Sequence, residues 1–150
     1  MYLELLLRQS KIGEQMKNII LFMFFLIFSF SSAFSGTMSG TFKTEVSEET
    51  GGYLLIKFSP CEKNKSLSCG IIENAIDKKG KISKKYEHKG KLLVWDMKDD
   101  GNGKFSSGKI WDPTKDKVYN SKMELLSKKK LAVSGCIAFF CRAQEWVKAN

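Results

Sequence analysis

The sequence predicts a single all-β domain, an eight-stranded antiparallel up-and-down barrel, preceded by an N-terminal signal peptide. Three observations lead to this fold class. From residue 40 onward, short segments rich in β-branched and aromatic residues recur, turn-forming clusters separate them, and apolar and polar residues alternate within them. Residues 36–150 are enough for one hydrophobic core but not for two domains.

Residues 16–35 have the three parts of a secretory signal peptide. Lys17 provides the positive start, an apolar run forms the centre, and the small residues Ala33 and Ser35 are placed for cleavage before Gly36. As a helix, the apolar run would reach only about 24 Å, against roughly 30 Å of bilayer hydrocarbon. We therefore expect a secreted or periplasmic protein that has no permanent membrane span after cleavage.

Residues 1–15 precede the charged start of this signal, which is unusual. A start codon assigned too early, with Met16 as the true start, explains them most simply. An uncleaved signal anchor is the alternative, because leucines in the first seven residues would lengthen the apolar zone. In both cases the domain that follows faces outward.

The eight expected strands are separated by explicit turn chemistry. Gly51-Gly52, Lys79-Gly80, the Asp99–Gly103 run and Asp112-Pro113 are the clearest turns. The strands are expected at residues 41–46, 53–59, 67–76, 92–97, 104–111, 118–126, 131–139 and 142–147.

Alternation is clearest in residues 118–126, where Tyr119, Ser121 and Met123 share one face and charged or amide side chains share the other. Eight antiparallel strands of this kind can close on themselves. Closure removes the exposed edges and leaves an interior that is filled by side chains or holds one small ligand. The five phenylalanines after residue 35 can be absorbed by one core.

All four cysteines, Cys61, Cys69, Cys136 and Cys141, follow the cleavage point, as expected for an oxidising compartment. Three pairings are possible, and we favour Cys61 with Cys69 and Cys136 with Cys141, because each pair spans a short connection. Zinc is the competing interpretation, but the spacings are not those of a zinc ribbon or finger. The single histidine, His88, lies between charged residues and is expected in solvent. We predict two disulfides, no metal and no cofactor.

The charge balance favours contact with anionic surfaces without identifying a partner. The chain has 25 lysines and arginines against 16 acidic residues, a net charge of +9. Only two of the basic residues are arginines, and acids are scattered among the lysines, whereas proteins that read phosphates favour arginine. We therefore expect no nucleic-acid binding and a monomeric protein.

Three patterns suggest an enzyme, but none is convincing. Residues 103–110 match the glycines and lysine of a phosphate loop, but an isoleucine replaces the magnesium-binding hydroxyl residue. Ser106 and Lys109 have the S-x-x-K spacing, but residues three apart on a strand point to opposite faces. Nothing in the sequence brings Cys136, as a nucleophile, next to His88 as its base. We predict a non-catalytic protein with no catalytic residues.

A resemblance rests on three stretches: GTFKTE near residue 40, GKLLVWDMKDDGNGKFSSGKIWDPTKDKVYNSKMEL in the middle, and SGCIAFFCRAQEWVKA at the end. Over most of residues 38–149 the sequence is similar to the small secreted bacterial family catalogued as domain of unknown function twenty-one forty-seven. Its most specific part is the run from Gly108 to Pro113. The family resembles the lipocalins in fold and has no assigned activity. The resemblance implies that Phe42 of the opening strand packs near Lys148 of the last.

A barrel with an apolar cavity would suit an acyl chain or a similar small hydrophobic molecule. We therefore expect a lipid-like ligand, and an exported, non-catalytic binding protein of the bacterial envelope. If side chains fill the interior, the alternative is a basic interaction module that docks on anionic envelope polymers or on a partner protein. The candidate pocket-lining residues are Phe42, Leu54, Ile56, Phe58, Tyr119, Met123 and Trp146.

Overall fold

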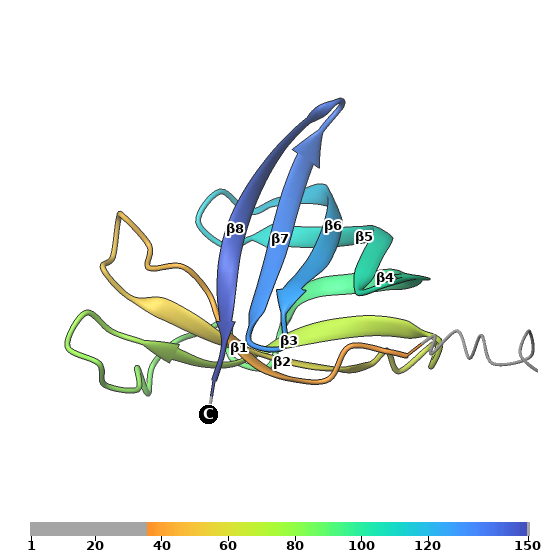
Figure 1. The fold of residues 1–150 in the computed structure, drawn as a ribbon. Helices are drawn as coiled ribbons and strands as arrows, with labels where there is room; N and C mark the ends of the chain where they lie inside the picture. Colours follow the sequence, from red (N-terminus) through yellow and green to blue (C-terminus); the bar gives the residue numbers. More distant parts are fainter. Residues whose placement is uncertain (1–35, 150) are drawn as a thin grey trace, which may run out of the picture. The chain divides into compact units, whose positions relative to one another are not determined.

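The computed structural model describes residues 36–149, so the expected mis-assigned start (1–15) and signal peptide (16–35) lie outside the described residues. The described chain forms eight strands, each antiparallel to the next, that close into one barrel (Figure 1). The strands are β1 (Gly40–Lys43), β2 (Tyr53–Pro60), β3 (Leu67–Ile76), β4 (Leu92–Gly101), β5 (Lys104–Asp112), β6 (Lys117–Ser127), β7 (Lys130–Ile137) and β8 (Phe140–Lys148). The predicted all-β, up-and-down barrel is confirmed.

The barrel closes through a short seam between its first and last strands. In this seam Phe42 pairs with Lys148 and Lys43 pairs with Val147. The family resemblance implied that Phe42 packs near Lys148, and the register places these two residues opposite each other. By contrast, β7 and β8 pair along their whole length, up to Ile137 opposite Phe140. The β7–β8 hairpin therefore extends well past the seam and rises from the rest of the barrel (Figure 1).

Four strand ends differ from the sequence prediction by two residues or more. β4 runs on to Gly101 instead of ending at residue 97, and β8 begins at Phe140 instead of residue 142. β1 stops at Lys43 instead of residue 46, because the Thr44 hydroxyl accepts the hydrogen bond from Leu54 N (3.0 Å) that a backbone carbonyl would accept in a continuing ladder. β7 stops at Ile137 instead of residue 139, because the turn comes at Ala138 and its neighbour. Ala138 has φ 51°, the left-handed region that two-residue hairpin turns require.

Because β-strand side chains alternate, every second residue of a regular strand points into the barrel. β3 and β4 depart from this alternation, because the register shifts between them. β6 shows the regular alternation directly, since Ser121 and Met123 are buried and Asn120, Lys122 and Glu124 are exposed. The core residues are Met38, Phe42, Ile56, Phe58, Ile72, Leu93, Val94, Met97, Phe105, Met123, Leu131, Val133 and Trp146. The interior is thus a packed apolar core over much of its length.

The two ends of the barrel carry different sets of connections. The connections 44–52, 77–91, 113–116 and 138–139 lie at one end, which we call the mouth. The short connections 61–66, 102–103 and 128–129 lie at the other, which we call the filled end because most of the large core side chains are near it. This arrangement follows from up-and-down topology, in which successive connections alternate between the ends.

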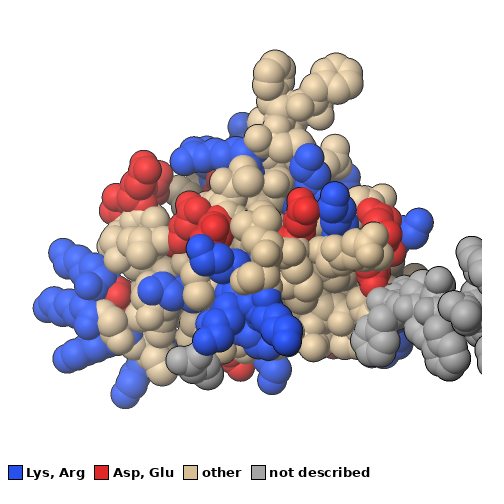
Figure 2. Space-filling view, viewed as in Figure 1, with Lys and Arg blue, Asp and Glu red and all other residues tan. Residues whose placement is uncertain are grey.

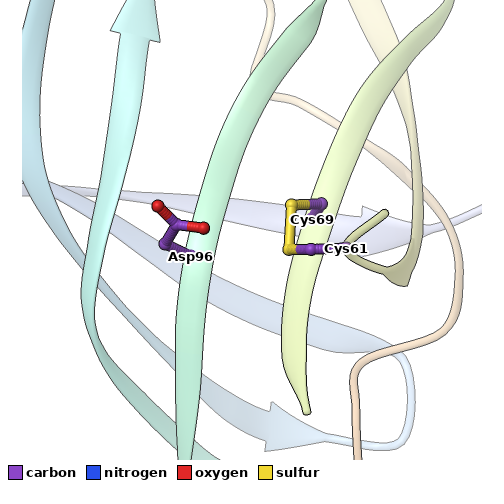
Figure 3. Close-up of side chains that lie close together, drawn as sticks. All are labelled: Cys61, Cys69 and Asp96. Atoms are coloured by element: carbon purple, nitrogen blue, oxygen red, sulfur yellow. A yellow bond between two sulfur atoms is a disulfide. The ribbon is translucent and has the colours of Figure 1, made fainter. Parts of the chain in front are cut away.

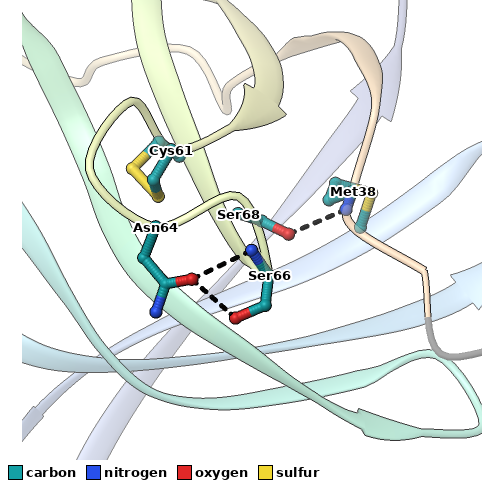
Figure 4. The surroundings of a disulfide bond; sticks show 6 residues. Met38, Cys61, Asn64, Ser66 and Ser68 are labelled. Atoms are coloured by element: carbon teal, nitrogen blue, oxygen red, sulfur yellow. Dashed lines mark hydrogen bonds between the residues drawn. A yellow bond between two sulfur atoms is a disulfide. The ribbon is translucent and has the colours of Figure 1, made fainter.

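The buried disulfide Cys61–Cys69 closes the connection between β2 and β3 at the filled end (Figure 4). Within the loop, Asn64 Oδ1 accepts hydrogen bonds from Ser66 N (3.0 Å) and from Ser66 Oγ (2.7 Å). An Asn side chain that binds the backbone two residues on is a common way to form a tight turn. The disulfide and this turn together hold β2 against β3.

The segment before β1 is fixed to the same end of the barrel. Met38 N donates to Ser68 Oγ (2.8 Å), and the Met38 side chain is buried in the core (Figure 4). Gly36 N donates to Asp99 Oδ2 (2.7 Å) at the end of β4. Residues 36–39 are therefore anchored to β3 and β4 by both polar and apolar contacts.

The second disulfide, Cys136–Cys141, joins two residues that face each other across the β7–β8 ladder. The structure therefore contains both disulfides that the sequence favoured, and residues 36–149 contain no free cysteine. The described residues include no helix long and apolar enough to cross a membrane.

Candidate functional site at the mouth of the barrel

Five of the seven predicted pocket residues lie in the packed core. Phe42, Ile56, Phe58, Met123 and Trp146 are at most 3% exposed. The Phe42 and Phe58 rings lie edge to face with centroids 5.8 Å apart, and the Phe58 and Trp146 rings are 6.2 Å apart. These side chains pack against one another and fill their end of the barrel. Whether they bind a ligand stays a prediction.

The other two predicted residues, Leu54 and Tyr119, are half-buried and lie nearer the mouth. Leu54 packs against the edge of the core. Tyr119 lies two residues before Ser121 on β6, so its side chain points inward as well, and its Cβ lies near Gly135 on the next strand. These two residues mark the level at which close packing of the interior ends.

Above that level, the inward face of the β7–β8 hairpin is accessible to solvent. Trp146 is buried and points inward, and the register of β8 is regular, so Gln144, Arg142 and Phe140 point to the same side. All three are exposed. The Trp146 indole Nε1 donates to Gln144 Oε1 (3.0 Å), which marks the boundary between the core and this accessible face.

A row of low side-chain bulk crosses four strands at this boundary. Gly108 on β5 pairs with Ser121 on β6, Ser121 pairs with Gly135 on β7, and Gly135 pairs with Arg142 on β8. Neighbouring strands lie about 4.8 Å apart, so the row spans roughly 14 Å. Two of its four members have no side chain, and its last member is the one arginine of the described chain.

Ser121 contributes a hydroxyl to this row. Its side chain is 4% exposed, and Ser121 Oγ has no hydrogen-bond partner among residues 36–149. Buried hydroxyls are almost always hydrogen-bonded, because an unpaired one loses its contacts with water without replacement. No carboxylate of the described chain lies within ion-pair distance of Arg142 either. The row thus contains one buried hydroxyl without a partner and, at its exposed end, one guanidinium.

The connection 77–91 places an aromatic cluster at the rim of the mouth. The His88 ring lies edge to face with Tyr86 (5.3 Å between centroids) and with Trp111 (4.9 Å). Lys91 Nζ lies 3.0 Å from His88 Nδ1 and 5.6 Å from the centre of the Trp111 ring. The His88 side chain is only 18% exposed. The expectation of a solvated histidine is therefore wrong, because its neighbours cover it.

The position of Tyr86 in this cluster changes its acidity. Its partial burial disfavours the phenolate and raises the pKa of Tyr86 above 10.0, and the negative charge of Glu87 acts in the same direction. Tyr86 and Trp111 also pack against the barrel core. The cluster therefore stays neutral at Tyr86 and ties the connection 77–91 to the wall of the barrel.

One group of side chains has the composition of a metal site. Cys61, Cys69 and Asp96 have ligand-type atoms within 4.8 Å of one another (Figure 3). However, metal ions bind cysteine as the thiolate, and both sulfur atoms are joined in a disulfide. Only the exposed Asp96 carboxylate is left as a ligand, so the group has no metal-binding capacity in this oxidised form.

The enzyme-like patterns do not form catalytic arrangements in the described chain. Lys109 Nζ donates to Asn120 Oδ1 (2.6 Å) on the outer surface, and Ser106 Oγ contacts Ser107 Oγ (3.4 Å). Cys136 is held in a disulfide and is not a thiolate nucleophile. That the protein is not an enzyme stays a prediction.

The sequence analysis missed Arg142, Ser121 and Gly135 as site residues. The alternation along residues 118–126 placed Ser121 on the inward face. Alternation within one strand does not show which residues of the neighbouring strands lie opposite it. His88 was missed because its burial depends on Trp111, which lies 23 residues further along the chain. A cross-strand register would have been needed to find the row.

Comparison with known proteins shows a family and a fold. Residues 40–148 match the model of a family described as "Uncharacterized protein conserved in bacteria (DUF2147)". A search of curated proteins gave no match. The solved structure of protein HP1028 from Helicobacter pylori, described as belonging to the lipocalin family, is similar with a TM-score of 0.54 at 12% identity. The similarity covers 75% of this chain and 82% of that one, and at this identity it shows a shared fold.

Proposed function

Since the chain belongs to the bacterial DUF2147 family and has a lipocalin-like barrel, we propose that it is an exported, non-catalytic protein that binds a small lipid-like ligand at its mouth. The observation that carries this proposal is the change along the interior. Packed core side chains fill one end, whereas the inward-pointing residues of the β7–β8 hairpin near the mouth are accessible.

The chemistry of the accessible face indicates an amphiphile with an acidic group. Phe140 and Ile137, which pair across the hairpin, offer apolar surface, and each methylene of a ligand buried there would contribute about 0.8 kcal/mol. Arg142 offers a planar guanidinium, which binds carboxylates and phosphates through paired hydrogen bonds. A molecule with a short acyl chain and a carboxylate would satisfy both features.

The proposed location outside the cytosol is supported by the cysteines. All four are in disulfides, and disulfides persist mainly in oxidising compartments. The Cys136–Cys141 bond also fixes the hairpin that carries Arg142. The proposed ligand site therefore depends on a disulfide that an oxidising compartment preserves.

Titration with dodecanoate tests this proposal. We expect dodecanoate to change the intrinsic tryptophan fluorescence with saturation, and dodecyltrimethylammonium, of equal chain length and opposite charge, to bind at least tenfold more weakly. Arg142→Gln should remove this preference for the anion. Lys122→Gln, a matched change of an exposed outward-facing cation on β6, should keep it.

Two results would contradict the proposal. One is equal binding of the two amphiphiles by the wild-type protein, and the other is an unchanged preference in Arg142→Gln. Salt-sensitive binding of anionic envelope polymer by a barrel that takes up neither amphiphile would favour the alternative, a basic interaction module.

A further inference from the structure

The end of the β7–β8 hairpin is the most apolar exposed feature of the described chain. We call residues 137–140 the hairpin tip. Phe139 is 97% exposed, Phe140 is 84% exposed and Ile137 is 66% exposed. Figure 2 shows uncharged side chains standing clear of the charged surface at the end of this hairpin. The expectation that the core absorbs all five phenylalanines is therefore wrong for two of them.

The apolar composition of the tip is unusual for a hairpin turn. The other tight connections of the barrel use polar residues and glycine, as in Asp99–Gly103 at the β4–β5 turn. At the tip, Ala138 has φ 51°, a conformation that usually selects glycine, asparagine or aspartate. Neither the exposed rings nor this backbone conformation stabilises the fold, so the tip has the character of a binding element.

The tip is also held in place before any contact is made. Cys136 and Cys141 form a disulfide across the ladder at its base, and Ile137 pairs with Phe140 just beyond. This covalent link fixes the spacing of the two strands one residue pair before the turn. A preformed apolar wedge loses little conformational entropy when it binds.

The size of the wedge favours a bilayer over a protein partner. A stable protein interface buries about 800 Å² on each side, from roughly 20–30 residues. The tip has four residues and projects from its surroundings, which suits insertion among lipid headgroups, where a few aromatic side chains suffice.

The charge around the tip selects anionic lipid. Arg142 lies two residues from Phe140, and Lys109 bonds Asn120, which pairs with Cys136 at the base of the tip. The connection 77–91, at the same end of the barrel, contains seven lysines and two acidic residues, and all the lysines are exposed. The connection 44–52 at that end contains three glutamates and no lysine, so the two connections together still carry a net positive charge. Basic residues near a negatively charged bilayer strengthen binding additively.

We propose that the hairpin tip docks the protein on the surface of an anionic lipid bilayer by inserting Phe139 and Phe140 at headgroup level. Docking in this orientation would bring the mouth towards the membrane. The proposal shares Phe140 and Arg142 with the proposed ligand site, but the exposed tip and the charges carry it without a bound ligand.

Vesicle flotation of the full exported domain tests the proposal. Vesicles of phosphatidylglycerol and phosphatidylethanolamine in equal amounts should bind the protein, and vesicles of phosphatidylcholine should bind it much more weakly. The double variant Phe139→Ser/Phe140→Ser should partition about 100-fold less than wild type. Leu126→Ser, which removes an apolar side chain that is 52% exposed at the opposite end of the barrel, should partition like wild type.

A second measurement reports the depth of the tip. In Phe139→Trp, anionic vesicles should shift the added indole emission to shorter wavelength, and brominated lipid should quench it, whereas the matched Leu126→Trp indole should be unaffected. The proposal is overturned if wild type fails to float with anionic vesicles or if the double serine variant floats equally well. It is also overturned if the double variant instead loses a wild-type self-association seen in sedimentation, because the tip would then contact a second copy of the chain.

Discussion

Gly108 lies where two strands and a core side chain meet, and replacing it with alanine tests the packing of the barrel. A Cβ built at Gly108 would lie 2.8 Å from the Trp95 carbonyl oxygen and would overlap the side chain of Met97, which is fully buried. The thioether of Met97 can move, but the Trp95 backbone is held in the β4–β5 ladder. The added methyl group therefore forces a backbone shift.

Forcing an extra methyl group into a packed core costs about 1–3 kcal/mol. The lower chain entropy of alanine in the unfolded state offsets about 0.4–1 kcal/mol of this. We therefore expect Gly108→Ala to lower the free energy of unfolding by about 1–2 kcal/mol. For a domain of this size, such a loss lowers Tm by about 4–12 °C.

Gly135→Ala is the matched control, because it also adds a methyl group on the inward face. Its Cβ would lie 3.5 Å from Ile110 Cγ2, an ordinary contact, and Gly135 lacks a positive φ. We expect Gly135→Ala to change stability by no more than about 0.5 kcal/mol, or to raise it. Urea denaturation followed by tryptophan fluorescence, with disulfides intact, measures both variants. Equal stability of the two variants would refute the packing of β4 against β5 described above.

Three further predictions concern the core, the amino end and the rim. Phe58→Ala, which removes the ring between Phe42 and Trp146, should cost about 3–5 kcal/mol in urea denaturation, and a loss below 1 kcal/mol would show that these rings do not form one packed cluster. If cleavage before Gly36 creates an ammonium group beside Asp99 Oδ2, the two groups form an ion pair. Asp99→Asn should then lower Tm more in the cleaved protein than in a form with one residue added before Gly36, and equal losses of Tm would exclude the ion pair. Because the folded pKa of Tyr86 lies above 10.0, the stabilisation by its neutral form is complete below pH 10.0 and is lost as pH rises through the folded pKa. In Tyr86→Phe the urea midpoint should therefore fall less steeply at alkaline pH than in wild type, and an unchanged fall would contradict the burial of Tyr86.

The fold followed from local features of the sequence because each strand carries its own signal. Alternation in residues 118–126 predicted which side chains of β6 face the core, and glycine with aspartate predicted the β4–β5 turn. The β7–β8 turn was misplaced because Ala138 and Phe139 have no turn chemistry, and the facing cysteines on either side determine its position. A disulfide pairing and a register are properties of two strands, not of one.

The candidate site was less accessible to sequence reasoning. Parity showed that Phe42, Phe58 and Trp146 point inward, but not that they fill one end and leave the other exposed. The row from Gly108 to Arg142 exists only through the register of four strands. The exposure of Phe139 and Phe140 depends on how far the hairpin extends beyond the short seam with β1, which no single segment encodes.

The most direct test of ligand binding at the mouth is the mapping of backbone amide chemical shifts during titration with dodecanoate. If the ligand binds at the row from Gly108 to Arg142, the largest changes in amide chemical shift are expected at Gly135 and Arg142, and smaller ones at Ser121. No change is expected at Gly101 and Gly103, which lie at the filled end. Saturable binding whose shifts cluster at the filled end, or the absence of any shift at concentrations that saturate other lipid-binding barrels, would contradict the proposed site.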